Sequence, residues 1–153
     1  MKNAYSCYAG TVPALSNALT SLHQYKKESL ANSPSIVELV VASDYETYWI
    51  SNQNPLGAFD TPITIIANSA HNKIWLNKIV GENLISNYFD DEIIKNLPAP
   101  SSKEKNIIFI HLLGSHNNYV ERYPRNFNKW NDNNKPNGNA YDNSILFNDY
   151  VLQ

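Results

Sequence analysis

The chain has 153 residues, of which 42% are hydrophobic, 12% aromatic and 17% charged, and its formal net charge is −2. This length and composition are typical of one globular domain and exclude a largely disordered chain, which would be poor in aromatic residues. The small negative charge provides no basic field for phosphates and argues against a nucleic-acid partner. The sequence contains 23 asparagines, which predict many loops and short elements.

Two helices are predicted near the N-terminus. Apolar residues recur at intervals of three and four between Val12 and Leu22, which is helical spacing, so Thr11 lies at or beside a helix N-terminus. A second helix is predicted to begin after Ser35, where Glu38 three residues later completes a capping box. That helix is expected to end near Ser43.

The next segment predicts an α/β unit. Residues 47–51 (Thr-Tyr-Trp-Ile-Ser) are rich in β-formers and have the length of a buried strand, and the breaker-rich residues 52–57 follow them. A further helix is predicted over 61–70 and a short strand over 72–75. A helix followed by a short strand is typical of an α/β unit.

Three acidic residues, Asp90, Asp91 and Glu92, precede a short predicted helix that contains Ile93, Ile94 and Leu97. They admit two interpretations. The three carboxylates could bind a metal ion, but acidic residues at a helix start more often complement the helix dipole, and this second interpretation is preferred.

The C-terminal third predicts one strand and one long helix. Residues 107–113 are almost continuously apolar and β-branched, which is typical of a central parallel strand covered on both faces. His116 follows that strand at its carboxyl end, where α/β proteins bind ligands. Residues 126–139 are expected to form a long polar loop, and residues 140–152 a helix. The apolar face of that helix is expected to include Ile145, Leu146 and Val151.

The patterns alone leave the roles of four residues open. His111 could be a hydrogen-bonded core residue, and His111 or His116 could bind a metal ion or an anionic oxygen. Arg122 could hold a phosphate through its two parallel N–H groups or lie on the surface. Thr11 could be a simple helix cap or a hydroxyl nucleophile stabilised by the helix N-terminus. For each residue except His116, the pattern alone favours the structural interpretation.

The sequence resembles the bacterial phosphoethanolamine transferases, which belong to the alkaline phosphatase and sulfatase superfamily. The resemblance is carried by a His-x-x-Gly-Ser-His segment and, in the family's order, by three further segments. These matching segments are Phe109–His116 with Tyr119, Arg122–Pro124 and Phe127; Gly10–Leu15; Tyr48–Gln53; and Ala140–Leu146 with Asp149 and Tyr150.

This resemblance implies an α/β fold, namely part of a sulfatase-like three-layer sandwich with a mostly parallel sheet flanked by helices. It implies that Thr11 is the nucleophile and a zinc ligand, and that Thr11 carries phosphoethanolamine from phosphatidylethanolamine to lipopolysaccharide, lipid A or a periplasmic glycan. His116 would bind the substrate or a second zinc ion. No role is carried over to Arg122. The family enzyme acts at the periplasmic face of the inner membrane.

The sequence also departs from the family pattern. Only ten residues precede Thr11, the family's membrane helices and its zinc-binding Glu have no counterpart, and no Asp-His-Gly sequence occurs. We therefore expect residues 1–153 to be a partial catalytic domain that has the missing segments as partners, does not bind zinc stably and is inactive alone. Having no signal peptide or membrane helix, the isolated chain would stay in the cytoplasm. The alternatives are a related sulfatase or phosphatase, and a non-catalytic remnant or binding module.

Overall fold

The computed structural model describes residues 5–6, 8–23, 25, 27–57, 61–77, 79–80, 83–84, 88–99, 105–131 and 136–153. The chain divides into two compact units. The first unit comprises residues 1–49, 54–74 and 98–109, and the second comprises residues 50–53, 75–97 and 110–153. No helix in the described part of the chain is long and apolar enough to cross a membrane.

The predicted helices of the first unit are present, although two are shorter than expected. The elements are α1 (Thr11–Leu19), the 3-10 turn η1 (Leu30–Asn32), α2 (Ile36–Ala42) and α3 (Thr61–Ala67). Helix α1 ends before residue 22 because Thr20 adopts an extended backbone and pairs with Ser35 in an isolated antiparallel bridge.

The capping box predicted for α2 is confirmed. The hydroxyl of Ser35 accepts a hydrogen bond from the Glu38 backbone N–H at 3.1 Å, and the Glu38 carboxylate accepts one from the Ser35 backbone N–H at 2.6 Å. The two residues thus satisfy backbone donors that have no partner within the helix. The helix ends at Ala42, and Ser43 is its C-cap, as the sequence indicates.

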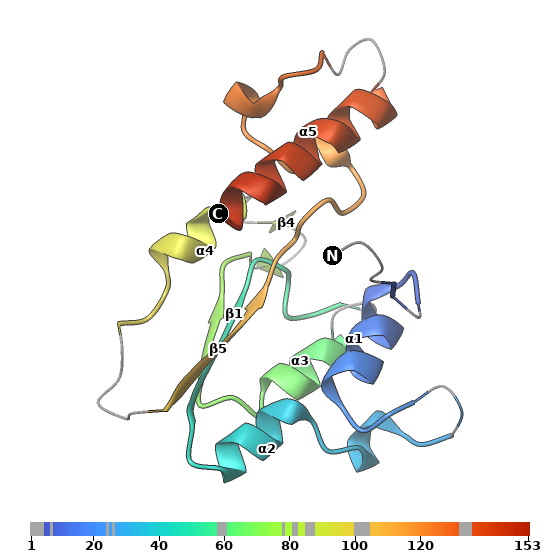
Figure 1. Cartoon of the computed structure of the whole chain (residues 1–153), viewed down its shortest axis with the longest axis vertical. Helices are drawn as coiled ribbons and strands as arrows, with labels where there is room; N and C mark the ends of the chain where they lie inside the picture. The colour runs from blue at the N-terminus through green and yellow to red at the C-terminus, as the bar shows by residue number, and fades with distance from the viewer. Residues whose placement is uncertain are drawn as a thin grey trace. The chain divides into compact units, whose positions relative to one another are not determined.

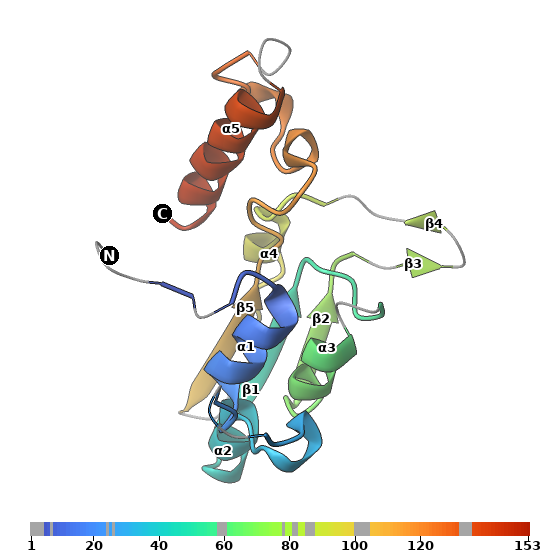
Figure 2. The ribbon, with the colours of Figure 1, turned by 90° about the vertical axis from the view of Figure 1, so that its right-hand side faces the viewer.

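Three strands, β1 (Glu46–Ser51), β2 (Asn72–Trp75) and β5 (Asn106–His111), form a sheet in the order β2–β1–β5. Figure 1 labels β1 and β5, and Figure 2 shows the three strands side by side. Strands β1 and β5 run parallel. The Glu46 N–H bonds to the Lys105 carbonyl at one end of the β1–β5 pair, and the Asn52 N–H bonds to the His111 carbonyl at the other. The predicted α/β class with a parallel sheet flanked by helices is confirmed.

The central strand of the described sheet is β1, so the prediction of a central position for residues 107–113 was wrong. Strand β5 lies at the edge of the three-stranded order, and its residues alternate between exposed and half-buried. Ile108 and Ile110 are 39% and 50% exposed. The apolar run was read as burial on both faces, but one face of this strand is open in the described part of the chain.

In the first unit, α1 and α3 pack side by side, and both lie with α2 against one face of the strands (Figure 2). Ile63, Ile66 and Ala67 of α3 are buried. Trp49 of β1 is 2% exposed, and its ring stacks on that of Phe109 with the centroids 5.9 Å apart. The buried residues of this unit therefore come from both its helices and its strands.

The second unit is built around α5 (Pro136–Val151). It also contains β3 (Ile79–Val80) and β4 (Asn83–Leu84), which pair antiparallel, the short helix α4 (Glu92–Lys95), and the 3-10 turns η2 (Tyr119–Glu121) and η3 (Arg125–Phe127). Helix α5 packs on η2 and η3. The buried core residues of this cluster are Tyr123, Ala140, Phe147 and Val151.

Two predictions for the region around α5 need correction. The loop expected over 126–139 is shorter, because η3 occupies its start and α5 begins at Pro136, a residue type that is favoured at the first helical position. The buried face of α5 includes Ala140, Asn143, Phe147 and Val151, whereas Ile145 is 43% exposed. Asn143 was overlooked because its burial depends on hydrogen bonds from the preceding loop.

Candidate functional site

Thr11 is the first residue of α1, as predicted. Gly10 is the N-cap residue and has an extended backbone (φ −97°, ψ 145°). No side chain at this position caps the helix. The Thr11 side chain is half-buried. First-turn N–H groups of a helix lack intrahelical partners and carry partial positive charge, so an anionic group beside the Thr11 hydroxyl would be stabilised there. Thr11 belongs to the first unit.

The turn that follows β5 carries His116 and belongs to the second unit. Gly114 has φ +59°, a left-handed conformation that disfavours any residue with a Cβ. Ser115 is half-buried, and His116 is exposed to solvent. The glycine thus allows the chain to turn sharply after the strand and leaves His116 accessible at the end of the turn.

Asp90 bonds to this turn, which the sequence did not reveal. Its side chain is 5% exposed, and its carboxylate accepts hydrogen bonds from the backbone N–H groups of Leu113 at 2.9 Å and Gly114 at 2.7 Å. The interpretation of Asp90 as a helix-dipole residue was therefore wrong. Among the three acids, Glu92 lies in the first turn of α4 and fits that interpretation.

Side chains that follow β1 complete the network around Asp90. The amide group of Asn52, which is fully buried, donates to Asp90 Oδ1 at 2.8 Å and to the Tyr88 carbonyl at 2.9 Å. Asn77 donates to Asn52 Oδ1 at 3.0 Å, and Gln53 donates to the Leu112 carbonyl at 2.9 Å. Residues read as breakers in the sequence thus hold the segments that follow neighbouring strands together.

His111 fits the structural interpretation. Its Nδ1 lies 3.2 Å from Ser51 Oγ, and the two residues end neighbouring strands. Burial lowers the pKa of His111 to about 4, although the charge of Asp90 opposes this shift. The imidazole is therefore neutral near pH 7 and is bound within the sheet.

Through its side chain, Arg122 contacts residues that are close to it in the sequence. Its side chain is 12% exposed, its Nε donates to the Asn117 carbonyl at 3.3 Å, and its Nη2 lies 3.7 Å from Glu121 Oε2. These contacts close the segment that follows His116. They support the structural interpretation of Arg122 rather than a phosphate fork.

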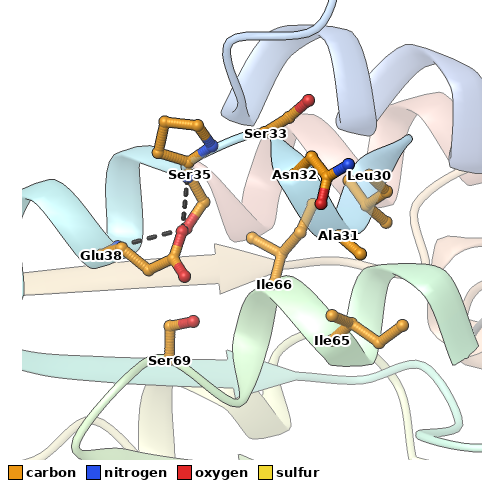
Figure 3. A pocket seen from close by; sticks show the side chains of 10 residues that line it. Leu30, Ala31, Asn32, Ser33, Ser35, Glu38, Ile65, Ile66 and Ser69 are labelled. Carbon is orange, nitrogen blue, oxygen red and sulfur yellow. Dashed lines mark hydrogen bonds between the residues drawn. The ribbon is translucent and has the colours of Figure 1, made fainter. Parts of the chain in front are cut away.

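The first unit contains a cleft of about 470 Å³ next to the capping box (Figure 3). The described residues that line it include Ser35, Glu38, Ile66 and Ser69, and Glu38 is the one charged residue among those described. The Glu38 carboxylate already accepts hydrogen bonds from the backbone N–H and the hydroxyl of Ser35. The charged group of the cleft is therefore already hydrogen-bonded to the helix cap, and we assign the cleft no role in catalysis.

Zinc does not fit the described residues by themselves. They include no group of three or more His, Cys, Asp or Glu side chains that could hold a metal ion. The resemblance assigns a primary zinc contact to Thr11, but one hydroxyl does not make a three- or four-ligand site.

This chain is similar in sequence to known proteins. The Sulfatase family matches residues 1–153. Phosphoethanolamine transferase EptC of Escherichia coli K12 is 30% identical over 93% of this chain, and phosphoethanolamine transferase CptA of Salmonella typhimurium is 28% identical over 92% of it. The chain spans 26% and 25% of the lengths of these two relatives.

A solved structure is also similar. The C-terminal periplasmic domain of EptC from Escherichia coli, crystallised in complex with Zn, superposes with a TM-score of 0.72 at 28% sequence identity. The match covers 93% of this chain and 43% of that domain. The match extends along nearly the whole chain, so the described fold corresponds to part of that domain.

Proposed function

The chain belongs to the Sulfatase family, and from this premise we propose that it is part of the catalytic domain of a phosphoethanolamine transferase. The observation that carries the proposal is the position of Thr11, whose hydroxyl opens α1 in the segment that resembles the nucleophile segment of these enzymes. The names of the relatives EptC and CptA support the same activity.

The proposed reaction has two displacement steps. The Thr11 hydroxyl oxygen attacks the phosphorus of phosphatidylethanolamine, the bond to the diacylglycerol oxygen breaks, and the leaving oxygen takes up the proton that Thr11 loses. A phosphate or hydroxyl oxygen of lipopolysaccharide, lipid A or a periplasmic glycan then attacks the phosphorus of the phosphothreonine. The bond from that phosphorus to the Thr11 oxygen breaks, and the Thr11 oxygen takes up the proton that the acceptor loses. The N–H groups at the start of α1 would stabilise the negative charge next to that oxygen.

His116 is proposed to bind the phosphoethanolamine group. It is exposed at the end of the turn after β5, and the carboxyl ends of parallel strands are where α/β proteins bind ligands. The solved relative is a periplasmic domain, and we place this domain in the same compartment, at the inner membrane. Zinc ligands would have to come from outside the described residues.

The nucleophile is tested in the full-length gene product with Thr11→Ala and Thr11→Ser. We expect Thr11→Ala to lower transfer from labelled phosphatidylethanolamine on the order of a thousandfold or more, because no hydroxyl remains to form the intermediate. Mass spectrometry should find a phosphoethanolamine adduct on the peptide that contains Thr11 in the wild type and, at a lower level, in Thr11→Ser.

Thr20→Ala is the matched control, because Thr20 lies at the other end of α1 and its hydroxyl bonds to the Ser16 carbonyl. This variant should keep the adduct. Transfer by Thr11→Ala at the wild-type rate would remove Thr11 from the mechanism. Hydrolysis of simple sulfate or phosphate esters without lipid-dependent transfer would instead identify a hydrolase of the same family.

A further inference from the structure

We propose that Asp90 is a positioning residue, whose buried carboxylate fixes the turn of residues 113–116 and thereby sets the place of His116. The inference rests on the proposed function, because it assigns His116 to substrate binding. Asp90 itself is buried and is not proposed to touch the substrate.

Each carboxylate oxygen of Asp90 accepts a backbone hydrogen bond from the turn. Oδ1 accepts hydrogen bonds from the Leu113 N–H and from Asn52 Nδ2, and Oδ2 accepts one from the Gly114 N–H at 2.7 Å. Hydrogen bonds to a charged acceptor are stronger than neutral ones, and they gain strength where water is excluded. Both oxygens therefore hold the backbone of the turn.

Asp90 is in turn held by the end of β1. Asn52 follows that strand, and its amide group is shared between Asp90 and the Tyr88 carbonyl. Asn77, which follows β2, donates to Asn52 Oδ1. The turn after β5 is thus linked through Asp90 to residues that follow the two other strands. One hydrogen-bond network therefore joins the segments that follow all three strands.

Gly114 itself has no side chain that could hold the turn. A Cβ at position 114 would meet no atom within 4 Å beyond its chain neighbours, so the space beside Gly114 is open on that side. The Ser115 hydroxyl is buried and has no hydrogen-bond partner among the described residues. Two backbone hydrogen bonds to Asp90, from the N–H groups of Leu113 and Gly114, therefore hold the residues directly before Ser115 and His116.

The acceptor pattern requires a carboxylate. Asparagine at position 90 would replace one of the two acceptor oxygens with an N–H₂ donor, which would face a backbone N–H of the turn. An aspartate accepts from both sides, whereas an amide leaves at least one of these donors unsatisfied. Asp90→Asn therefore changes the turn with almost no change in side-chain volume.

The test is a double-mutant cycle in the full-length gene product. Asp90→Asn should lower kcat/KM for phosphatidylethanolamine on the order of a hundredfold, mainly through KM, because a small displacement of a binding group has effects of this size. His116→Ala should have a similar effect. If Asp90 acts through His116, adding Asp90→Asn to His116→Ala should lower kcat/KM by less than about threefold further.

Asp91→Asn is the matched control, because it removes the same charge one residue along, and Asp91 makes no side-chain capping bond. It should leave kcat/KM close to the wild-type value. Full additivity of Asp90→Asn and His116→Ala, or an unchanged KM in Asp90→Asn, would overturn the inference. If Asp90→Asn does not fold, Asp90→Glu, which keeps the charge but displaces the oxygens, replaces it in the cycle.

A second measurement separates this inference from the proposed function. In amide hydrogen exchange, Asp90→Asn should speed exchange at Leu113 and Gly114 by about tenfold or more, and Asp91→Asn should not. Unchanged exchange at both amides would overturn the anchoring by Asp90. A wild-type protein without transferase activity would contradict the proposed function, and the exchange result would still decide whether Asp90 holds the turn.

Discussion

The low pKa of His111 makes the stability of the fold depend on pH. Burial, opposed by the charge of Asp90, lowers this pKa to about 4, whereas an unfolded histidine titrates near its ordinary value of 6.5. Between these values the unfolded chain binds more protons than the folded chain, so stability falls as the pH falls. The neutral imidazole therefore contributes stability that is present above pH 6.5 and is lost as the pH falls toward about 4.

We expect the wild type to lose up to about 3 kcal/mol of unfolding free energy through His111 between about pH 7 and pH 4. Urea unfolding of wild type and His111→Gln over this range measures the contribution, because carboxylates titrate in both proteins and cancel in the difference. His23→Gln is the control, since His23 is exposed. A His111→Gln protein with the wild-type pH dependence would contradict the assignment.

Asparagine shows what composition can and cannot predict at the level of single residues. The 23 asparagines correctly predict many loops, but Asn52, Asn77 and Asn143 are buried. Asn143 donates to the Trp130 carbonyl at 2.7 Å and accepts from the Trp130 N–H at 3.0 Å, so it serves a loop 13 residues away. Sequence spacing gives no sign of such partners, because they meet only after the chain has folded.

Elements with a local signal were predicted well. The Ser35 and Glu38 capping box and the strand at 72–75 depend on neighbouring residues, and the structure has both where they were expected. Predictions that depended on tertiary neighbours were less accurate. The edge position of β5 and the buried face of α5 are set by what packs against them, and the apolar pattern of those segments does not contain that information.

The corrected face of α5 predicts opposite outcomes for two residues of the same helix. Phe147 is 2% exposed and makes edge contacts with Phe89 and Phe127, with centroids 5.9 and 4.9 Å apart. We expect Phe147→Ala to lower the unfolding free energy by about 3 to 5 kcal/mol through lost burial and a remaining cavity.

Ile145→Ala, two residues away, is the matched control. Ile145 is 43% exposed, so its truncation should cost less than about 1 kcal/mol. Chemical denaturation of both variants at one pH gives the comparison. Equal destabilisation by the two substitutions would restore the original assignment of Ile145 to the buried face.

At the scale of the whole molecule, the exposed face of β5 affects whether molecules associate with one another. Strand β5 is an edge strand of the described sheet, and Ile108 and Ile110 both point to its exposed face. An edge strand with exposed apolar side chains favours pairing between molecules. The net charge of −2 and the pI near 6.0 provide little repulsion against it.

We therefore predict that a protein of residues 1–153 self-associates, and most strongly near pH 6, where its charge is smallest. The double variant Ile108→Lys and Ile110→Lys should shift it toward monomer, because charged residues on an edge strand oppose pairing. Ile65→Lys controls for added charge alone, since Ile65 is 55% exposed but lies on α3. Sedimentation velocity over a range of concentrations distinguishes the two. If Ile65→Lys reduced association as much as the double variant, net charge rather than the edge of β5 would control the association.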